Sequence, residues 1–70
     1  MIAPLDVFKL ADGKGGRWIG CAETLPHALL VIRKNGAGKY LVFSHLSQHK
    51  EFYELTSQGE VVLLQSLGPS

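Results

Sequence analysis

The stretch 39-KYLVFSHLSQHKEFYEL-55 decides the fold that this chain can adopt. Residues 40–43 are all apolar, two of them aromatic, and place apolar side chains on both faces, which is typical of a strand at the centre of a sheet. A second apolar-rich run, residues 51–55, follows after a polar interval that contains Ser44, Ser47, Gln48 and Lys50. The stretch therefore predicts a β-hairpin.

A first hairpin is predicted ahead of this one. Residues 5–10 and 17–22 have extended patterns, and the segment between them, 11-ADGKGG-16, is rich in turn-forming glycine. Strict alternation along the second strand puts Trp18, Gly20 and Ala22 on one face and Ile19 and Cys21 on the other. We expect Trp18 to pack on a helix, since large aromatic residues dominate small cores. An exposed binding aromatic is the alternative.

One helix is predicted over residues 24–35. Leu25, Ala28, Leu29 and Ile32 recur at helical spacing and form an apolar stripe. Thr24 is suited to cap the first amides, and Asn35-Gly36 to end the last turn. The predicted core is Leu25, Ala28, Leu29, Ile32, Val42 and Tyr53, with Phe8, Ile19 and Leu41 as additional members.

The last strand is predicted over residues 60–65, and the chain from Leu67 to Ser70 is expected to fray. The whole chain is expected to be a single small α+β domain with an ordered core at about 5–65, because 70 residues make one domain. Its sheet has four or five largely antiparallel strands, one helix on one face and the order ββαβββ. This order resembles that of ubiquitin-like β-grasp domains, although no motif of that family is present.

Composition narrows the functional classes. Cys21 is the single cysteine, so an intrachain disulfide and a multi-cysteine zinc site are excluded, and a cytoplasmic location is expected. The net charge is +1, without the concentrated basic footprint of a dedicated polyanion binder. No stretch has the apolar length of a membrane span, and Asp6 and Lys9 interrupt what a signal peptide would need.

Three patterns could carry chemistry, and each has a simpler interpretation. His45 and His49 could share a metal with Cys21 or His27, but two histidines in a hairpin loop are more simply solvated. The glycine-rich turn 13–16 could hold an anion, yet it lacks the spacing of a phosphate-binding loop. Cys21 could be a nucleophile, yet a cysteine on an apolar strand is usually inert. We therefore predict no enzyme activity, cofactor or metal.

A nucleic-acid-binding sheet face is the alternative function. It would combine aromatic and basic residues, and the chain supplies both kinds in its strands: Lys9, Arg17, Trp18, Lys39, Tyr40, Phe43 and Lys50. Three acidic residues in the same strands, Asp6, Glu51 and Glu54, would repel phosphates. This alternative is consequently less favoured than a protein partner.

A protein-interaction module is the favoured function, because the chain has more apolar surface than a small domain can cover. The helix is too apolar for one buried face, and the last strand is apolar on both faces. The expected partner is a second copy of the chain, as a homodimer, or a larger protein. The candidate interaction residues are Val61, Val62, Leu63, Leu64, Leu30, Val31 and Trp18.

Overall fold

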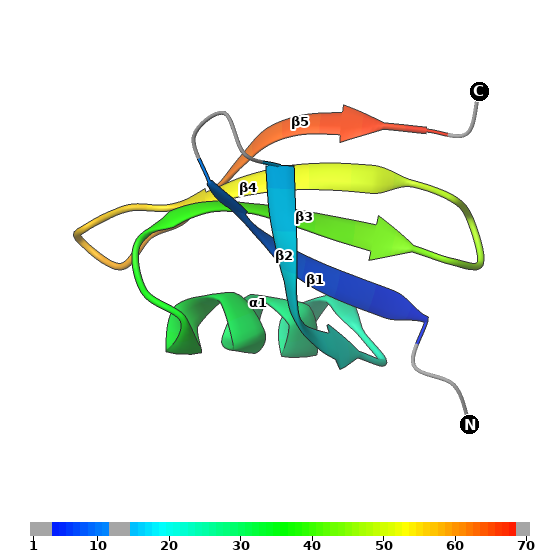
Figure 1. Ribbon diagram of the computed structural model, residues 1–70, viewed down its shortest axis with the longest axis horizontal. Coiled ribbons are helices and arrows are strands. Elements are labelled where there is room, and N and C mark those ends of the chain that lie inside the picture. The colour runs from blue at the N-terminus through cyan, green and yellow to red at the C-terminus, as the bar shows by residue number, and fades with distance from the viewer. Residues whose placement is uncertain (1–3, 12–14, 69–70) are drawn as a thin grey trace.

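The computed structural model describes residues 4–11 and 15–68. Figure 1 shows one helix and a twisted sheet of five strands in the order ββαβββ, which confirms the predicted α+β class. The elements are β1 (Leu5–Ala11), β2 (Gly15–Ala22), α1 (Leu25–Lys34), β3 (Gly38–Ser44), β4 (Lys50–Leu55) and β5 (Val61–Leu67).

The sheet is antiparallel throughout, with the strand order β2-β1-β3-β4-β5. The predicted hairpin of residues 39–55 is confirmed as β3 and β4, with Tyr40 opposite Tyr53. The first hairpin is confirmed as β1 and β2. β3 is the central strand of the sheet, as its apolar sequence predicted. β2 and β5 are the two edge strands.

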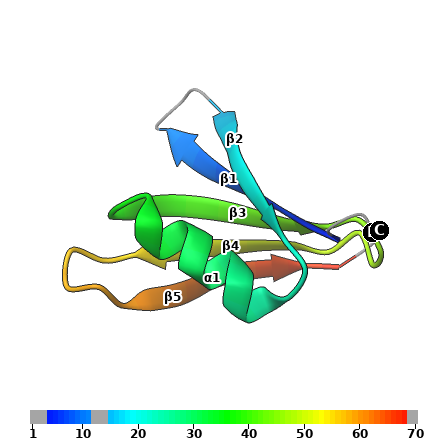
Figure 2. The same cartoon turned by 90° about the horizontal axis from the view of Figure 1, so that it is seen from below.

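Local signals define the helix. The Thr24 hydroxyl accepts a hydrogen bond from the His27 amide at 3.4 Å, and Asn35 closes the last turn by donating its amide to the Ile32 carbonyl at 3.0 Å. Gly36 then takes a positive φ of 85°, a conformation that favours glycine. Seen from below in Figure 2, α1 lies across one face of the sheet, and its main contacts are with β1 and β2.

The core lies between α1 and this face of the sheet. Four predicted members are buried, namely Ala28, Ile32, Val42 and Tyr53. Leu29 is only half-buried, and Leu25 is 39% exposed, so its assignment to the core was wrong. Leu25 is the first residue of α1, and at this end of the helix the apolar stripe does not face the core. The prediction also missed four buried residues: Val7, Ala22, Tyr40 and Leu55.

A β-bulge in β2 overturns the predicted faces of that strand. Phe8 pairs with Trp18 but Val7 pairs with Gly20, so Ile19 is an extra residue without an opposite partner. An extra residue breaks the strict alternation of a strand. Trp18 consequently lies on the helix-free face and is 56% exposed, whereas Gly20 faces α1. The expectation that Trp18 packs on the helix was therefore wrong.

The helix approaches the sheet closely at Gly20. A methyl group placed there would lie 3.3 Å from Cγ1 of Val31. Any larger side chain at this position would push the helix away. The absence of a side chain at Gly20 thus allows α1 to pack closely on the sheet, and the indole of Trp18 takes no part in this contact.

The end of the chain also departs from expectation. β5 continues to Leu67, two residues beyond the predicted strand, and Leu67 pairs with Lys50 instead of fraying. Pro69 and Ser70 lie outside the described residues, as do Asp12, Gly13 and Lys14 of the predicted turn and anion loop.

Candidate interaction surfaces

The edge strand β5 forms the first candidate surface. Its outer side has no neighbouring strand, so the backbone amides and carbonyls along that side have no partner within the described sheet. Four of its apolar side chains are 42–50% exposed, namely Val62, Leu63, Leu64 and Leu67. Leu64 is an extra residue, since Tyr53 pairs with Leu63 and Phe52 with Gln65. No charged residue and no proline occurs in Val61–Leu67.

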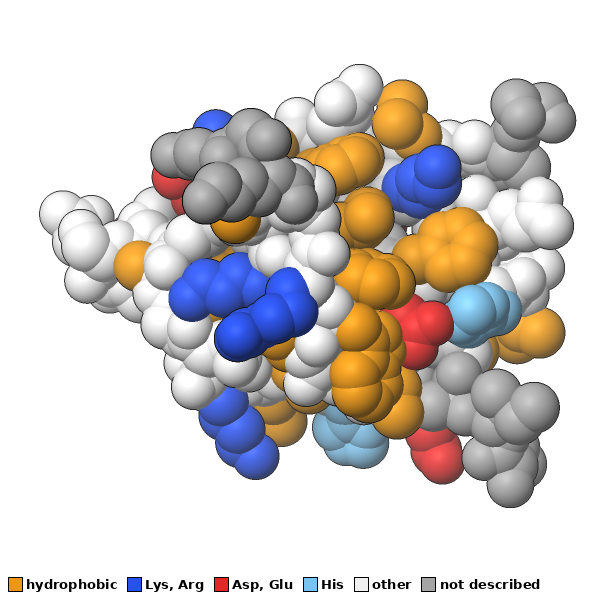
Figure 3. All heavy atoms as spheres, viewed as in Figure 1, with side chains coloured by type: hydrophobic (Ala, Val, Ile, Leu, Met, Phe, Trp, Pro, Cys, Tyr) orange, Lys and Arg blue, Asp and Glu red, His pale blue; other side chains and the backbone are white. Residues whose placement is uncertain are grey.

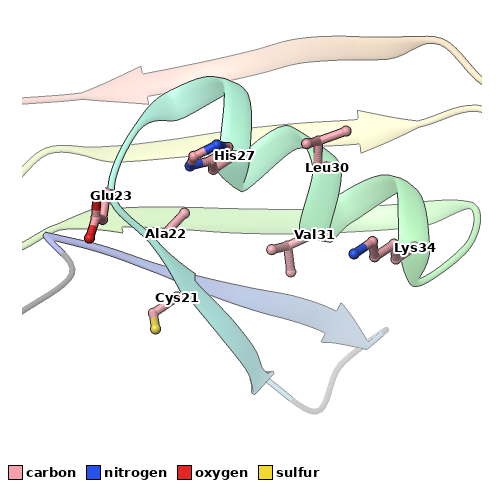
Figure 4. Close-up of a pocket in the computed structure, with 7 residues that line it drawn as sticks. All are labelled: Cys21, Ala22, Glu23, His27, Leu30, Val31 and Lys34. Atoms are coloured by element: carbon pink, nitrogen blue, oxygen red, sulfur yellow. The ribbon is translucent and has the colours of Figure 1, made fainter.

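A groove between α1 and β2 forms the second candidate surface (Figure 4). Leu30 and Val31 lie on its helix side, with Glu23 at one end and Lys34 at the other. Its remaining lining residues are Cys21, Ala22 and His27. The Cys21 sulfur points away from the helix and from His27, so the two side chains do not form a nucleophile and base pair.

The helix-free face of the sheet forms the third candidate surface. Opposite residues in neighbouring strands share a face, so the register assigns this face three rows of side chains. The first row is Cys21, Asp6, Phe43, Lys50 and Leu67. The middle row is Trp18, Phe8, Leu41, Phe52 and Gln65. The third row is Gly16, Leu10, Lys39, Glu54 and Val62.

The helix-free face holds all three phenylalanines and the only tryptophan of the chain. Both tyrosines lie on the opposite face, in the core, where burial raises the pKa of each phenol. Figure 3 shows the helix-free face obliquely, with a band of hydrophobic side chains across its middle and polar groups along one margin. The most apolar aromatic residues thus face outward.

A hydrogen-bonded cluster holds Trp18 in place on this face. The indole Nε1 donates to Oδ1 of Asp6 at 3.1 Å, and the other carboxylate oxygen, Oδ2, pairs with Nε2 of His45. The His45 ring packs edge-on against Phe43 with centroids 5.0 Å apart. An exposed aromatic side chain fixed in this way loses less rotamer entropy when a partner covers it.

The electrostatics of the cluster depend on Asp6. Partial burial acts to raise the pKa of its carboxyl group, but the hydrogen bonds from His45 and Trp18 and the positive charge of His45 outweigh that effect. The pKa of Asp6 is therefore lower than usual, and its carboxylate form is favoured.

The seven candidate residues from the sequence fall on different surfaces. Val61, Val62, Leu63 and Leu64 lie together on β5, Leu30 and Val31 lie in the groove at the opposite edge, and Trp18 lies on the helix-free face. Val61 is half-buried against the core. They therefore belong to three parts of the surface, although Val62 shares the helix-free face with Trp18.

The alternative set for nucleic-acid binding is divided as well. Trp18, Phe43, Lys39 and Lys50 share the helix-free face, but the register puts Lys9 and Arg17 on the other one. Lys9 donates to the Asn35 carbonyl at 2.8 Å and lies over the Tyr40 ring, which is itself buried. Only two lysines thus remain beside the exposed Trp18 and the half-buried phenylalanines of the helix-free face.

The two histidines of the hairpin loop, His45 and His49, have different partners and do not share a site. His45 pairs with Asp6, while the His49 carbonyl accepts the Ser44 amide at 2.9 Å to close the turn between β3 and β4. Over residues 4–11 and 15–68 there is no group of three or more His, Cys, Asp or Glu side chains placed to hold a metal ion.

The predicted protein-interaction set omitted the residues that distinguish the helix-free face, namely Asp6, Phe8, Leu41, Phe43, His45 and Phe52, although Phe43 was in the nucleic-acid alternative and His45 was a possible metal ligand. Strand alternation could have indicated some of these residues. Positions 8, 41, 43 and 52 are each next to a buried position of the same strand, so their side chains point to the opposite face of the sheet. No sequence pattern indicated the pairing of Asp6 with His45, because they lie 39 positions apart in the chain.

None of the helices in the described part of the chain is long and apolar enough to cross a membrane. Comparisons with protein-family models, with curated proteins and with solved structures give no match.

Proposed function

We propose that this protein is a non-catalytic interaction module that associates with a second copy of itself by pairing the free edges of β5. The observation that carries the proposal is that β5 is an edge strand with neither charge nor proline along its length and with exposed apolar side chains. Natural edge strands usually carry such blocking residues, so an edge that has only the bulge at Leu64 favours pairing.

A second β5 is the partner that suits this edge best. Antiparallel pairing about a two-fold axis would join the two sheets into one and give outward amides of both strands carbonyl groups to bind. Because Val61–Leu67 has no charge, its pairing with itself brings no like charges together. We place this association in the cytoplasm, on the ground that a lone cysteine suits a reducing compartment.

Hydrogen exchange measured by NMR at two protein concentrations tests the proposal. We expect the outward amides of β5 to be protected at high concentration and to exchange rapidly after dilution, because only a paired strand shields them. Val62→Lys and Leu63→Lys place a lysine on the two faces of the edge and should each abolish the protection.

The β2 edge is the internal control, and its outward amides should exchange rapidly at every concentration. Rapid exchange of the β5 amides in concentrated wild-type protein, or equal protection in both lysine variants, would disprove edge pairing. Protection that appears only with a different, larger protein would replace the homodimer with a heterologous partner.

A further inference from the structure

No part of the chain that the structure describes covers the helix-free face of the sheet, although this face holds all the phenylalanines and the tryptophan. A sheet face this apolar is normally packed against another layer. On this face Trp18 is 56% exposed and the three phenylalanines are half-buried.

The charges on this face decide what can cover it. Lys39 and Lys50 are matched there by Asp6 and Glu54, and His45 pairs with Asp6. A single-stranded nucleic acid would bring its phosphates against two carboxylates, and stacking proteins of that kind rely on an excess of positive charge. A neutral face with both signs is suited to a surface that carries the same charges in a complementary arrangement.

The row pattern is complementary to itself. A two-fold axis along the middle row, across the strands, lays the first row of one copy over the third row of the other. Lys50 then lies over Glu54 of the second copy, and Glu54 over its Lys50. Likewise Leu67 covers Val62 of the second copy, while Lys39 lies over the ring of its Phe43.

The axis itself passes mainly through apolar residues. Each residue of the middle row meets its own counterpart, so Phe8, Leu41 and Phe52 form the centre of the contact, with Trp18 at the β2 end and Gln65 at the β5 end. No two charges of the same sign are opposed in this arrangement. Two sheets packed in this way keep their strands within about 30° of each other and lie ~10 Å apart.

We propose that two copies of this chain pack face to face through the helix-free face, with Lys50 of each copy paired to Glu54 of the other. The interface includes the side chains of Val62 and Leu67 but not the outer backbone groups of β5, so it neither needs nor prevents pairing of that edge. The helices lie on the outside of such a dimer, and the cluster of Trp18, Asp6 and His45 is enclosed at its margin.

Trp18 reports on this interface alone. It is the only tryptophan, and it lies on β2, at the opposite side of the sheet from β5. Face-to-face packing covers its indole, so dilution of wild-type protein should shift its fluorescence to longer wavelength and increase its quenching by acrylamide. Edge pairing through β5 leaves Trp18 exposed and leaves both readouts unchanged.

A charge exchange tests the pairing. Lys50→Glu opposes two glutamates across the interface, and Glu54→Lys opposes two lysines, so each single variant should weaken association by about tenfold or more. The double variant, Lys50→Glu with Glu54→Lys, should recover the wild-type dissociation constant. Glu23→Lys, at the end of the groove beside α1 and outside the three rows, is the matched control and should change nothing.

Sedimentation measured together with Trp18 fluorescence gives a definite outcome. Recovery in the double variant, also with Leu63→Lys present to block the edge, supports the face-to-face dimer. Trp18 emission that does not change with dilution, or a double variant as weak as the singles, overturns it. Salt-sensitive quenching of Trp18 by single-stranded DNA without any change in protein mass would likewise overturn it, in favour of nucleic acid.

Discussion

The two edge strands of the sheet, β2 and β5, each contain a β-bulge, but only β2 is covered by the helix. Each edge strand carries one extra residue, Ile19 in β2 and Leu64 in β5. In β2 the bulge turns Gly20 toward α1, and the helix lies against this half of the sheet. β5 has no comparable helix contact, and its apolar side chains stay exposed.

The difference shows that the position of the helix, rather than the bulge, decides which edge is left open. A bulge twists an edge and can protect it from pairing. β2 has in addition Arg17, three glycines and a covering helix, whereas β5 has only the bulge. The following predictions test this contrast, beginning with the largest expected effect.

Truncation of Ile32, the buried residue through which α1 packs on the sheet, should lower the stability most. Ile32 is fully buried between α1 and the sheet, so Ile32→Ala should lower the free energy of unfolding by about 2–5 kcal/mol. Leu30→Ala, on the exposed side of the same helix, is the control and should cost less than about 0.5 kcal/mol. Urea denaturation measures both, and Leu29→Ala should fall between them because Leu29 is half-buried. Equal midpoints for Ile32→Ala and Leu30→Ala would contradict the helix orientation.

A side chain at Gly20, where α1 lies close to β2, should cause the second-largest loss of stability. Gly20→Leu inserts a side chain where a methyl group already lies 3.3 Å from Val31, so we expect a loss of about 1–3 kcal/mol. Val31→Ala makes room at that point and should recover part of the loss in the double variant. A double-mutant cycle with purely additive effects would show that the two residues do not meet.

The pair of Asp6 and His45 should contribute less, below about 1 kcal/mol, because it is partly exposed. The pKa of Asp6 is lower in the folded chain than its usual value of 3.8, so the unfolded chain binds this proton more tightly. The stabilisation is therefore present above about pH 4 and disappears as the pH falls through the folded pKa. Unfolding curves from pH 6 to pH 2 should fall less steeply for Asp6→Asn than for wild type, and parallel curves would argue against the pair.

Substitutions on β5 should affect the single chain least. Val62 and Leu63 are 42% and 50% exposed, so Val62→Lys and Leu63→Lys should change the unfolding free energy of the dilute monomer by no more than about 0.5 kcal/mol. The same substitutions should abolish edge pairing. If either variant unfolds the dilute chain, the open edge is part of the core and the contrast with β2 is lost.

The sequence by itself determined the elements with local signals. Thr24, the apolar stripe and Gly36 are all within one helical segment, and each acts on backbone groups only a few residues away. The hairpin of residues 39–55 is similarly local, since its two apolar runs flank one short polar turn. Element type, order and fold class were therefore predicted from the residues alone.

Only the tertiary structure decided which surfaces remain open. Strand order placed β5 at an edge, and this order depends on pairings such as that of β1 with β3, whose paired residues are 29 to 39 positions apart in the chain. One extra residue, Ile19, reversed the face of Trp18, because a strand alternates with a period of two and any insertion shifts all that follows. The contact of Asp6 with His45 likewise needed the folded sheet to bring distant residues together. Local patterns encode how a segment folds, whereas the covering of each face depends on where the one helix comes to lie.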